Sequence, residues 1–102
     1  MKILLICSGG MSTFMLIQAL EKEAKKLNIN NFSADAIGAN EIDEYDKDFD
    51  ILLVAPQIKH KFEQMQEIAS SRNKKIYQIS MAEYSPLGTN KLLTNIAKVL
   101  EE

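Results

Sequence analysis

The sequence predicts an α/β fold, in which a parallel β-sheet is covered by helices on both faces. Two short runs, residues 3–6 and 51–55, are wholly apolar, which is typical of strands buried on both faces of a sheet. Between and after these runs, apolar residues recur at helical spacing in segments long enough to connect parallel strands. Strands and helices that alternate in this way form a parallel sheet with right-handed connections.

The composition is that of one small globular domain. A chain of 102 residues can build a single core, and hydrophobic and charged contents of 46% and 25% are ordinary for such a domain. The net charge of −2 gives no basic excess for a nucleic-acid partner. The single cysteine excludes an intramolecular disulfide, and no segment is long and apolar enough for a signal peptide or a membrane span. We therefore expect a cytoplasmic protein.

The first half of the chain predicts a strand, a long helix and a shorter second strand. After the apolar run at 3–6, Ser12 is expected to be the N-cap of a helix over residues 13–27. Asparagines follow this helix and are expected to end it, and residues 32–37 alternate weakly, as in a short strand. The helix is expected to bury one apolar face, formed by Leu16, Leu20, Ala24 and Leu27.

Residues 38–48 are acidic, with Lys47 as the only basic residue. Two interpretations are open here, a metal site and a short helix whose carboxylates are solvated. Because the carboxylates are spread along the segment without histidine or cysteine, we expect the solvated helix and no metal ion. The acidic residues are Glu41, Asp43, Glu44, Asp46 and Asp48.

The second half of the chain predicts two further strand–helix units. The strand at 51–55 is followed by a helical apolar pattern over residues 58–69, and a fourth strand is expected at 75–79. Residues 80–88 are expected to form a loop, and residues 90–100 a final helix. The buried residues expected here are Ile58, Phe62, Met65, Ala69, Ile76, Ile79, Leu92, Leu93, Ile96, Val99 and Leu100.

Ligands of parallel α/β sheets bind at the carboxyl ends of the strands. The predicted strands end at Cys7, Gly38, Pro56 and Ser80. We therefore expect a site at the loop that follows Cys7, flanked by residues 56–60 and by residues 80–85.

The loop after Cys7 has the features of an anion site. Gly9 and Gly10 allow the backbone to approach a bound group, and the free N–H groups at the start of a helix point toward one spot. The same helix end favours the thiolate of Cys7 over its thiol. A thiolate beside a bound phosphate suggests a nucleophile that accepts a phosphoryl group. The alternative is that Cys7 is a buried, unreactive thiol at the end of a strand.

Comparison with other phosphate loops narrows the chemistry. A nucleotide-binding P-loop needs a lysine that is missing here, and a response regulator needs acidic residues where this chain has Cys7 and Ala55. Low-molecular-weight tyrosine phosphatases clamp phosphate with an arginine at the position of Thr13, whereas the only arginine here, Arg72, lies at the far end of a predicted helix. No Asp-Pro pair offers a general acid. Phosphate on Cys7 would thus be held rather than hydrolysed, as in a phosphoryl carrier.

Two other interpretations of the loop remain open. One is a phosphatase or arsenate-reductase-like enzyme with a degenerate loop. The other is a non-catalytic module that binds a small anion or a flavin, although flavodoxins usually have longer chains and aromatic loops that stack on the flavin.

The phosphate loop and the segment after the third strand together resemble a known family. They are similar to the enzyme IIB component of the phosphoenolpyruvate-dependent sugar phosphotransferase system, in its lactose/cellobiose/chitobiose branch. The resemblance implies a single type 3 enzyme IIB domain over residues 1–102. It also implies a three-layer sandwich with a four-stranded parallel sheet of order 2-1-3-4, like low-molecular-weight tyrosine phosphatases and flavodoxin-like folds. The residues that carry it are Cys7-Ser8-Gly9-Gly10-Met11-Ser12-Thr13 and Pro56-Gln57-Ile58.

The resemblance implies that Cys7 receives a phosphoryl group from a histidine of enzyme IIA. Cys7 would then pass this group to a disaccharide that the membrane component, enzyme IIC, translocates. The chain would need no cofactor and would meet the membrane only through enzyme IIC. The implied phosphate-binding residues are Ser8, Gly9, Gly10, Met11, Ser12 and Thr13, and the implied partner-docking residues are Met11, Pro56, Gln57, Ile58 and Tyr84.

Three further residues bear on the site. The loop predicted at residues 80–88 is called the third loop below. Relatives often carry a glycine directly after the tyrosine of this loop, whereas this chain has Tyr84-Ser85. His60, the only histidine, is expected to be a partly exposed helix residue, because the implied scheme takes its histidine from the partner. Met15 is open to two interpretations, as part of an adaptable docking surface or as part of the core.

Overall fold

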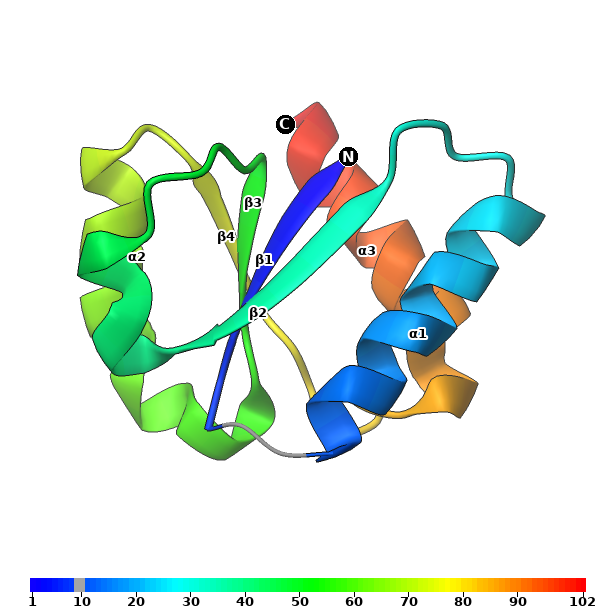
Figure 1. The fold of residues 1–102 in the computed structure, drawn as a ribbon, viewed down its shortest axis with the longest axis horizontal. Helices are drawn as coiled ribbons and strands as arrows, with labels where there is room; N and C mark the ends of the chain where they lie inside the picture. The colour runs from blue at the N-terminus through cyan, green and yellow to red at the C-terminus, as the bar shows by residue number, and fades with distance from the viewer. Residues whose placement is uncertain (9–10) are drawn as a thin grey trace.

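The computed structural model describes residues 1–8 and 11–102, apart from the side chains of Met11 and Ser12. Within this part of the chain, four parallel strands form one sheet in the order β2-β1-β3-β4 (Figure 1). The strands are β1 (Lys2–Cys7), β2 (Ser33–Gly38), β3 (Ile51–Val54) and β4 (Lys75–Gln78). The predicted α/β class and strand order are confirmed.

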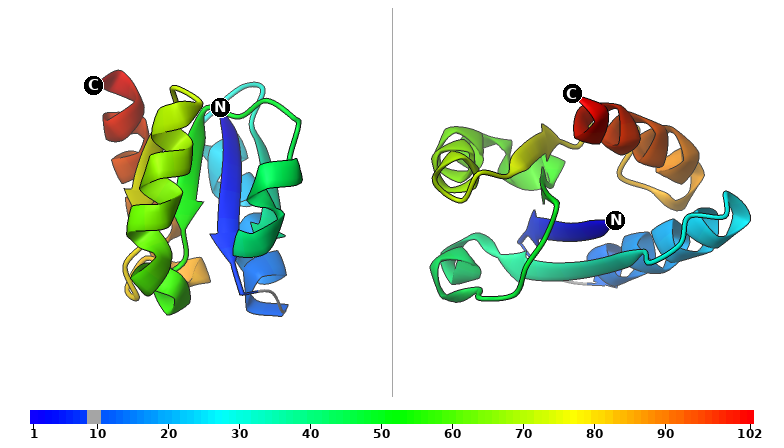
Figure 2. Two further views of the ribbon diagram at one scale, coloured as in Figure 1. Left: turned by 90° about the vertical axis from the view of Figure 1, so that its left-hand side faces the viewer. Right: turned by 90° about the horizontal axis from the view of Figure 1, so that it is seen from above.

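The sheet is the middle of three layers. Helices α1 (Met11–Lys26) and α3 (Thr89–Glu101) cover one face, and α2 (Phe62–Ser71) covers the other together with the 3-10 helix η1 (Ala39–Glu44), as Figure 2 shows. Two further 3-10 helices are η2 (Pro56–Lys61) and η3 (Pro86–Gly88). Each connection between strands that follow one another in the chain thus contains an α-helix or a 3-10 helix, as the alternation in the sequence predicts.

The two apolar runs form the two central strands. Every residue from Ile3 to Ile6 and from Ile51 to Ala55 is at most 3% exposed, because helices cover both faces of β1 and β3. Most of the other predicted core positions are also buried, among them Leu16, Met65 and Ile79. Four are only half-buried: Phe62, Ile76, Val99 and Leu100.

The ends of the helices differ from the sequence prediction in position. Helix α1 begins at Met11, so Ser12 lies in its first turn rather than at its N-cap. The helix ends at Lys26, and Leu27 is 45% exposed, so Leu27 does not belong to the apolar face as predicted. Asn28 follows with a positive φ of 59°, a conformation that asparagine tolerates better than most residues, which explains the early stop.

The predicted helix over 58–69 is divided in two. Pro56 begins the 3-10 helix η2, in which Ile58 departs from helical backbone angles, and α2 begins only at Phe62. Proline fixes its own φ and has no N–H, so it favours a tight turn directly after the strand. Apolar periodicity does not distinguish such a turn from an α-helix.

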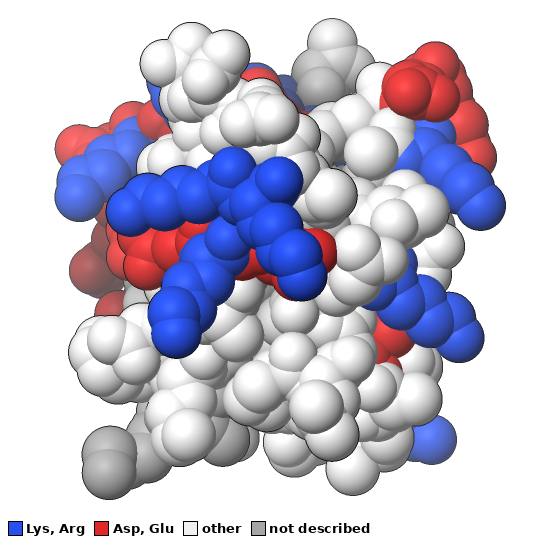
Figure 3. All heavy atoms as spheres, turned by 90° about the vertical axis from the view of Figure 1, so that its right-hand side faces the viewer, with Lys and Arg blue, Asp and Glu red and all other residues white. Residues whose placement is uncertain are grey.

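Charge is unevenly distributed over the helical face formed by α1 and α3. Lysine side chains gather over the body of the helices, among several carboxylates, whereas uncharged side chains cover the end nearest to the start of α1 (Figure 3). The exposed lysines of the two helices are Lys22, Lys25, Lys26, Lys91 and Lys98.

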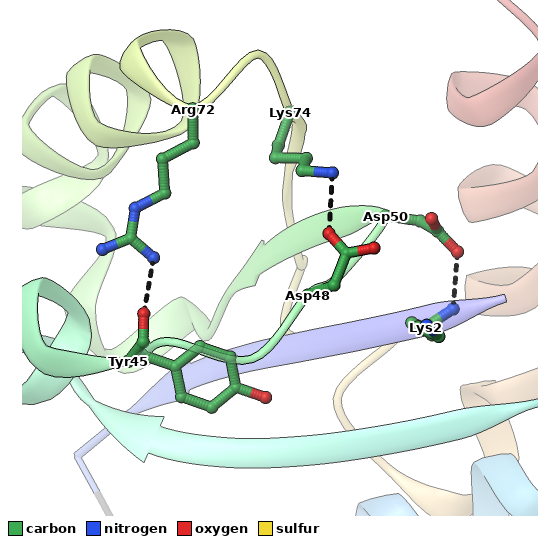
Figure 4. Close-up of polar contacts among 6 residues, drawn as sticks. All are labelled: Lys2, Tyr45, Asp48, Asp50, Arg72 and Lys74. Atoms are coloured by element: carbon green, nitrogen blue, oxygen red, sulfur yellow. Dashed lines mark hydrogen bonds and ion pairs between the residues drawn. The ribbon is translucent and has the colours of Figure 1, made fainter.

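The acidic segment between β2 and β3 is a solvated 3-10 helix, as predicted, but it is also anchored at its C-terminal end. The guanidinium of Arg72 donates to the carbonyl oxygens of Ile42 (2.8 Å) and Tyr45 (3.0 Å). An ion pair joins Lys74 Nζ to Asp48 Oδ1 at 3.0 Å (Figure 4). The end of α2 therefore holds this crossover against the sheet.

The outer edge of β2 is capped by carboxylates. Ser33 N–H donates toward β1, to Met1 O, so strand alternation directs the N–H groups of Ala36 and Gly38 away from β1. Ala36 N–H donates to Asp35 Oδ1 at 3.0 Å, and Gly38 N–H donates to Glu41 Oε1 at 3.2 Å. Two outward donors of this edge strand therefore already have partners.

Candidate functional site

Cys7 lies at the carboxyl end of β1, a central strand of the sheet, opposite Gly38 in β2. Its thiol is free and only 5% exposed. The thiol donates a long hydrogen bond to the carbonyl oxygen of Ile37, with Sγ and O 3.8 Å apart.

A groove of about 590 Å³ opens beside Cys7, between α1, β2 and η1. Of the predicted site residues, Cys7, Ser8 and Thr13 lie together in its wall. Gly9 and Gly10, and the side chains of Met11 and Ser12, lie outside the described part of the structure. The other wall residues, which sequence analysis did not assign to a site apart from Gly38, are Phe14, Ile17, Ala34, Asp35, Ala36, Ile37, Gly38, Asn40 and Glu41.

Four of the predicted docking residues do not line this groove: Pro56, Gln57, Ile58 and Tyr84. Gln57 is exposed and Pro56 is half-buried in η2, whereas Ile58 is only 7% exposed and packs into the core. Ile58 therefore offers little surface to a partner and holds the η2 turn in place. His60 is exposed on the same 3-10 helix, in agreement with the expectation of an exposed helix residue.

Tyr84 connects the third loop to the start of α1. Its hydroxyl lies 2.9 Å from Oγ1 of Thr13, and either group can donate. Thr13 is 4% exposed and belongs to the first turn of the helix. When Tyr84 donates, the hydroxyl proton of Thr13 remains free for an anion in the loop; when Thr13 donates, that proton is used. Sequence analysis assigned Tyr84 to docking and missed this link.

A buried carboxylate, Glu83, lies under the same loop and was also missed. It is 2% exposed and accepts hydrogen bonds from Ser80, Tyr77 and Asn95. The sequence does contain a signal, because Ser80-Met81-Ala82-Glu83 matches the capping-box pattern. Ser80 N–H donates to Glu83 Oε1 at 2.9 Å, and Glu83 N–H donates back to Ser80 Oγ at 3.3 Å.

Several apolar side chains are exposed on the elements around the site. Phe14 and Met15 are 61% and 54% exposed in the first turns of α1, and Met81 and Leu87 are 71% and 99% exposed in the third loop. Met15 therefore belongs to the surface and not to the core. The uncharged end of the helical face in Figure 3 adjoins the start of α1. Scattered exposed apolar residues are ordinary, but a group of them on neighbouring elements suits a contact surface.

The described residues contain neither a metal-binding cluster nor a membrane-spanning helix. Within 1–8 and 11–102, no group of three or more His, Cys, Asp or Glu side chains is arranged to hold a metal ion. No helix in this part of the chain is long and apolar enough to cross a membrane. Arg72, the only arginine of the sequence, is bound to carbonyls of the acidic crossover, so it does not act as a phosphate clamp for Cys7.

Two solved structures are similar to this chain. The solution structure of the cellobiose-specific phosphotransferase IIB component protein from Borrelia burgdorferi is 35% identical, with a TM-score of 0.76, over 99% of this chain and 92% of that chain. The lactose-specific IIB component domain of the phosphoenolpyruvate:carbohydrate phosphotransferase system from Streptococcus pneumoniae is 20% identical, with a TM-score of 0.75, over 92% of this chain and 95% of that chain. The second likeness shows the fold alone.

A search of curated proteins finds no match. The family model described as "PTS system, Lactose/Cellobiose specific IIB subunit" matches residues 2–101, which is nearly the whole chain. The fold and the similar structures agree with this match. The chain therefore belongs to the lactose/cellobiose-specific IIB family of the sugar phosphotransferase system and is a sugar phosphotransferase carrier.

Proposed function

We propose that Cys7 carries the phosphoryl group in a two-step transfer. In the first step the thiolate sulfur attacks the phosphorus of a phosphohistidine on enzyme IIA; the S–P bond forms, the P–N bond breaks, and the histidine nitrogen leaves with the bonding electron pair. In the second step a sugar hydroxyl oxygen attacks the same phosphorus; the O–P bond forms and the S–P bond breaks. The hydroxyl proton passes to solvent, and the thiolate of Cys7 is restored.

The position of Cys7 is the observation that carries this proposal. The sulfur lies at the end of a central strand, where the chain turns into the 16-residue helix α1. The start of such a helix offers unpaired N–H groups and a partial positive charge, which stabilise both a thiolate and a phosphoryl group. Thr13, in the first turn, adds a hydroxyl to the wall beside Cys7. The remaining residues of the proposed phosphate loop are Ser8, Gly9, Gly10, Met11 and Ser12.

The lack of an arginine clamp favours a carrier over a phosphatase. Arginine stabilises the charge that develops during phosphoryl transfer, and Arg72 is held at the acidic crossover by two carbonyl oxygens. The phosphorylated Cys7 would therefore react slowly with water. A carrier needs this persistence until its acceptor arrives.

The exposed apolar residues support docking to two partners in turn. Enzyme IIA would bind first and the membrane component enzyme IIC second. Both would bind over the exposed apolar residues and over the predicted docking residues other than the buried Ile58; these are Phe14, Met15, Met81 and Leu87, with Met11, Pro56, Gln57 and Tyr84. Membrane association would occur only through enzyme IIC, and residues 1–102 would act as one IIB domain in the cytoplasm. The acceptor would be a disaccharide of the cellobiose, chitobiose or lactose type. The name of the Borrelia burgdorferi structure supports cellobiose, and the description of the family model supports lactose or cellobiose.

Mass spectrometry of the intact chain tests the acceptor residue. After incubation with phosphorylated enzyme IIA, we expect one added phosphoryl group, located on Cys7 by peptide mapping. The variant Cys7→Ser should gain none, because a hydroxyl is a much weaker nucleophile than a thiolate at neutral pH. His60→Gln is the matched control, since this exposed side chain should leave the phosphorylation unchanged.

Two outcomes would contradict the proposal. Phosphate on His60 in the Cys7→Ser variant would show that Cys7 is not the acceptor residue. Complete release of inorganic phosphate within seconds from wild-type phosphocysteine, without sugar or enzyme IIC, would favour a phosphatase.

A further inference from the structure

The carboxylate of Glu83 is the most completely hydrogen-bonded side chain near the third loop. Oε1 accepts from the N–H of Ser80 (2.9 Å) and from its hydroxyl (2.8 Å). Oε2 accepts from the hydroxyl of Tyr77 and from the side-chain amide of Asn95, each at 2.7 Å. Tyr77 belongs to β4 and Asn95 to α3, so one buried side chain joins the loop to the sheet and to a helix.

An ionised carboxylate fits this environment best. Four donors point at its two oxygen atoms, which is the full acceptor capacity of a carboxylate, whereas an amide in its place offers one oxygen acceptor for these donors. Burial alone would raise the pKa of Glu83, but the hydrogen bonds from Ser80, Tyr77 and Asn95 outweigh it and hold that pKa below its usual value. Burial, followed by the bond to Glu83, raises the pKa of Tyr77 to about 12.

The loop that Glu83 fixes is also held from its other side. Gly88 lies so close to the loop backbone that a Cβ atom there would be 2.4 Å from Ala82 O and 2.8 Å from Glu83 Cα. The next residue, Tyr84, reaches across to the hydroxyl of Thr13 in the first turn of α1. A continuous series of contacts therefore runs from β4 and α3, through Glu83 and Tyr84, to the helix end beside Cys7.

We propose that Glu83 is a positioning residue for phosphoryl transfer, which acts by holding the hydroxyl of Tyr84 on Thr13. The proposal rests on the function proposed for Cys7. When Tyr84 is the donor in this 2.9 Å contact, the proton of Thr13 stays available to an anion in the phosphate loop. Glu83 thereby helps to align the incoming phosphoryl group without contacting it.

A double-mutant cycle on the transfer step tests this proposal. The variants are Glu83→Gln, Tyr84→Phe and the two combined, with Glu67→Gln as a control on the exposed surface of α2. The rate constant for phosphorylation of Cys7 is measured in single turnover at saturating phosphorylated enzyme IIA, at a temperature where circular dichroism shows each variant folded. The affinity for unphosphorylated enzyme IIA is measured by calorimetry.

We expect each single variant to lower the rate constant about tenfold, because small misplacements of a reacting group have effects of this size. The double variant should be no slower than the slower single variant, since both changes break the same series of contacts. The affinity of Glu83→Gln for enzyme IIA and the rate of Glu67→Gln should stay at the wild-type values, because Glu83 is buried and Glu67 is exposed on α2. A merely structural role of Glu83 would change stability without this non-additive pattern.

Three results would overturn the proposal: an unchanged rate in Glu83→Gln, additive losses in the double variant, or a loss confined to affinity. If Glu83→Gln does not fold, Tyr77→Phe takes its place in the cycle, because it removes a single donor to Oε2 and leaves three. Failure of the function proposed for Cys7 is distinct, because wild type itself would then gain no phosphate.

Discussion

Two irregular segments, the acidic crossover of residues 39–50 and the third loop of residues 80–88, use carboxylates in opposite ways. The crossover carries many carboxylates, most of them exposed, and Arg72 binds it through backbone carbonyl oxygens. The third loop has a single carboxylate, Glu83, which is buried and accepts four hydrogen bonds. Exposed charges contribute little to stability, whereas a buried carboxylate with full hydrogen bonding is costly to disturb. The density of charge in a sequence is therefore a poor guide to where charge matters.

The largest effect on stability is expected from Glu83→Ala. This change leaves four donors without their acceptor inside the protein, and we expect the free energy of unfolding to fall by about 3 kcal/mol. Urea denaturation followed by circular dichroism measures it. A loss no larger than that of an exposed Glu67→Ala control would remove the contrast between the two segments.

A smaller effect is expected from Arg72→Met, which keeps most of the apolar stem and removes the guanidinium. The carbonyl oxygens of Ile42 and Tyr45 then lose their donors, at a cost of about 1–2 kcal/mol in unfolding free energy. The matched control is Lys74→Met, which breaks the exposed ion pair to Asp48 and should change stability little. Equal losses in both variants would show that the carbonyl contacts are not the anchor.

The stability that Glu83 gives to the third loop should depend on pH. The folded-state pKa of Glu83 lies below its ordinary value of 4.5, so its carboxylate stabilises the fold above pH 4.5. This stabilisation is lost as the pH falls from 4.5 through the lowered pKa. Glu83→Gln cannot ionise, so its stability deficit relative to wild type should narrow over that range in urea titrations. A deficit that stays constant from neutral pH into this range would contradict the assignment.

The smallest effect is expected from the combined change Asp43→Asn and Glu44→Gln. Both side chains are exposed in η1, so the melting temperature and the phosphorylation of Cys7 should match wild type within error. Calorimetry and single-turnover phosphorylation provide the two readings. Loss of a tightly bound divalent cation in this variant would mean that a metal site had been overlooked.

The sheet was predictable because its central strands are marked by runs that have no polar residue. Residues 3–6 and 51–54 can only be buried on both faces, and two such strands require helical connections. The phosphate loop after Cys7 stays a prediction from its glycines and hydroxyl residues, because Gly9 and Gly10 lie outside the described residues. The boundaries of α1 were less certain, since apolar spacing does not show where a terminal residue such as Leu27 leaves the core.

The contacts that support the site were not predictable from spacing. Thr13 and Tyr84 meet although 71 residues separate them, and the groove beside Cys7 forms from α1, β2 and η1. Such contacts depend on how helices pack on the sheet. Glu83 was hidden for another reason, because its capping-box pattern occurs in a loop, where no long helix follows.

The capped edge of β2 has a consequence for solubility at high concentration. An open edge strand is a template on which a strand from another molecule can add, and this is a common route to aggregation. A strand that approached β2 would have to displace the carboxylates of Asp35 and Glu41 and would meet their negative charge. Because Ala34, Ala36 and Ile37 of the same strand line the groove, excluding strand addition also keeps the approach to Cys7 open.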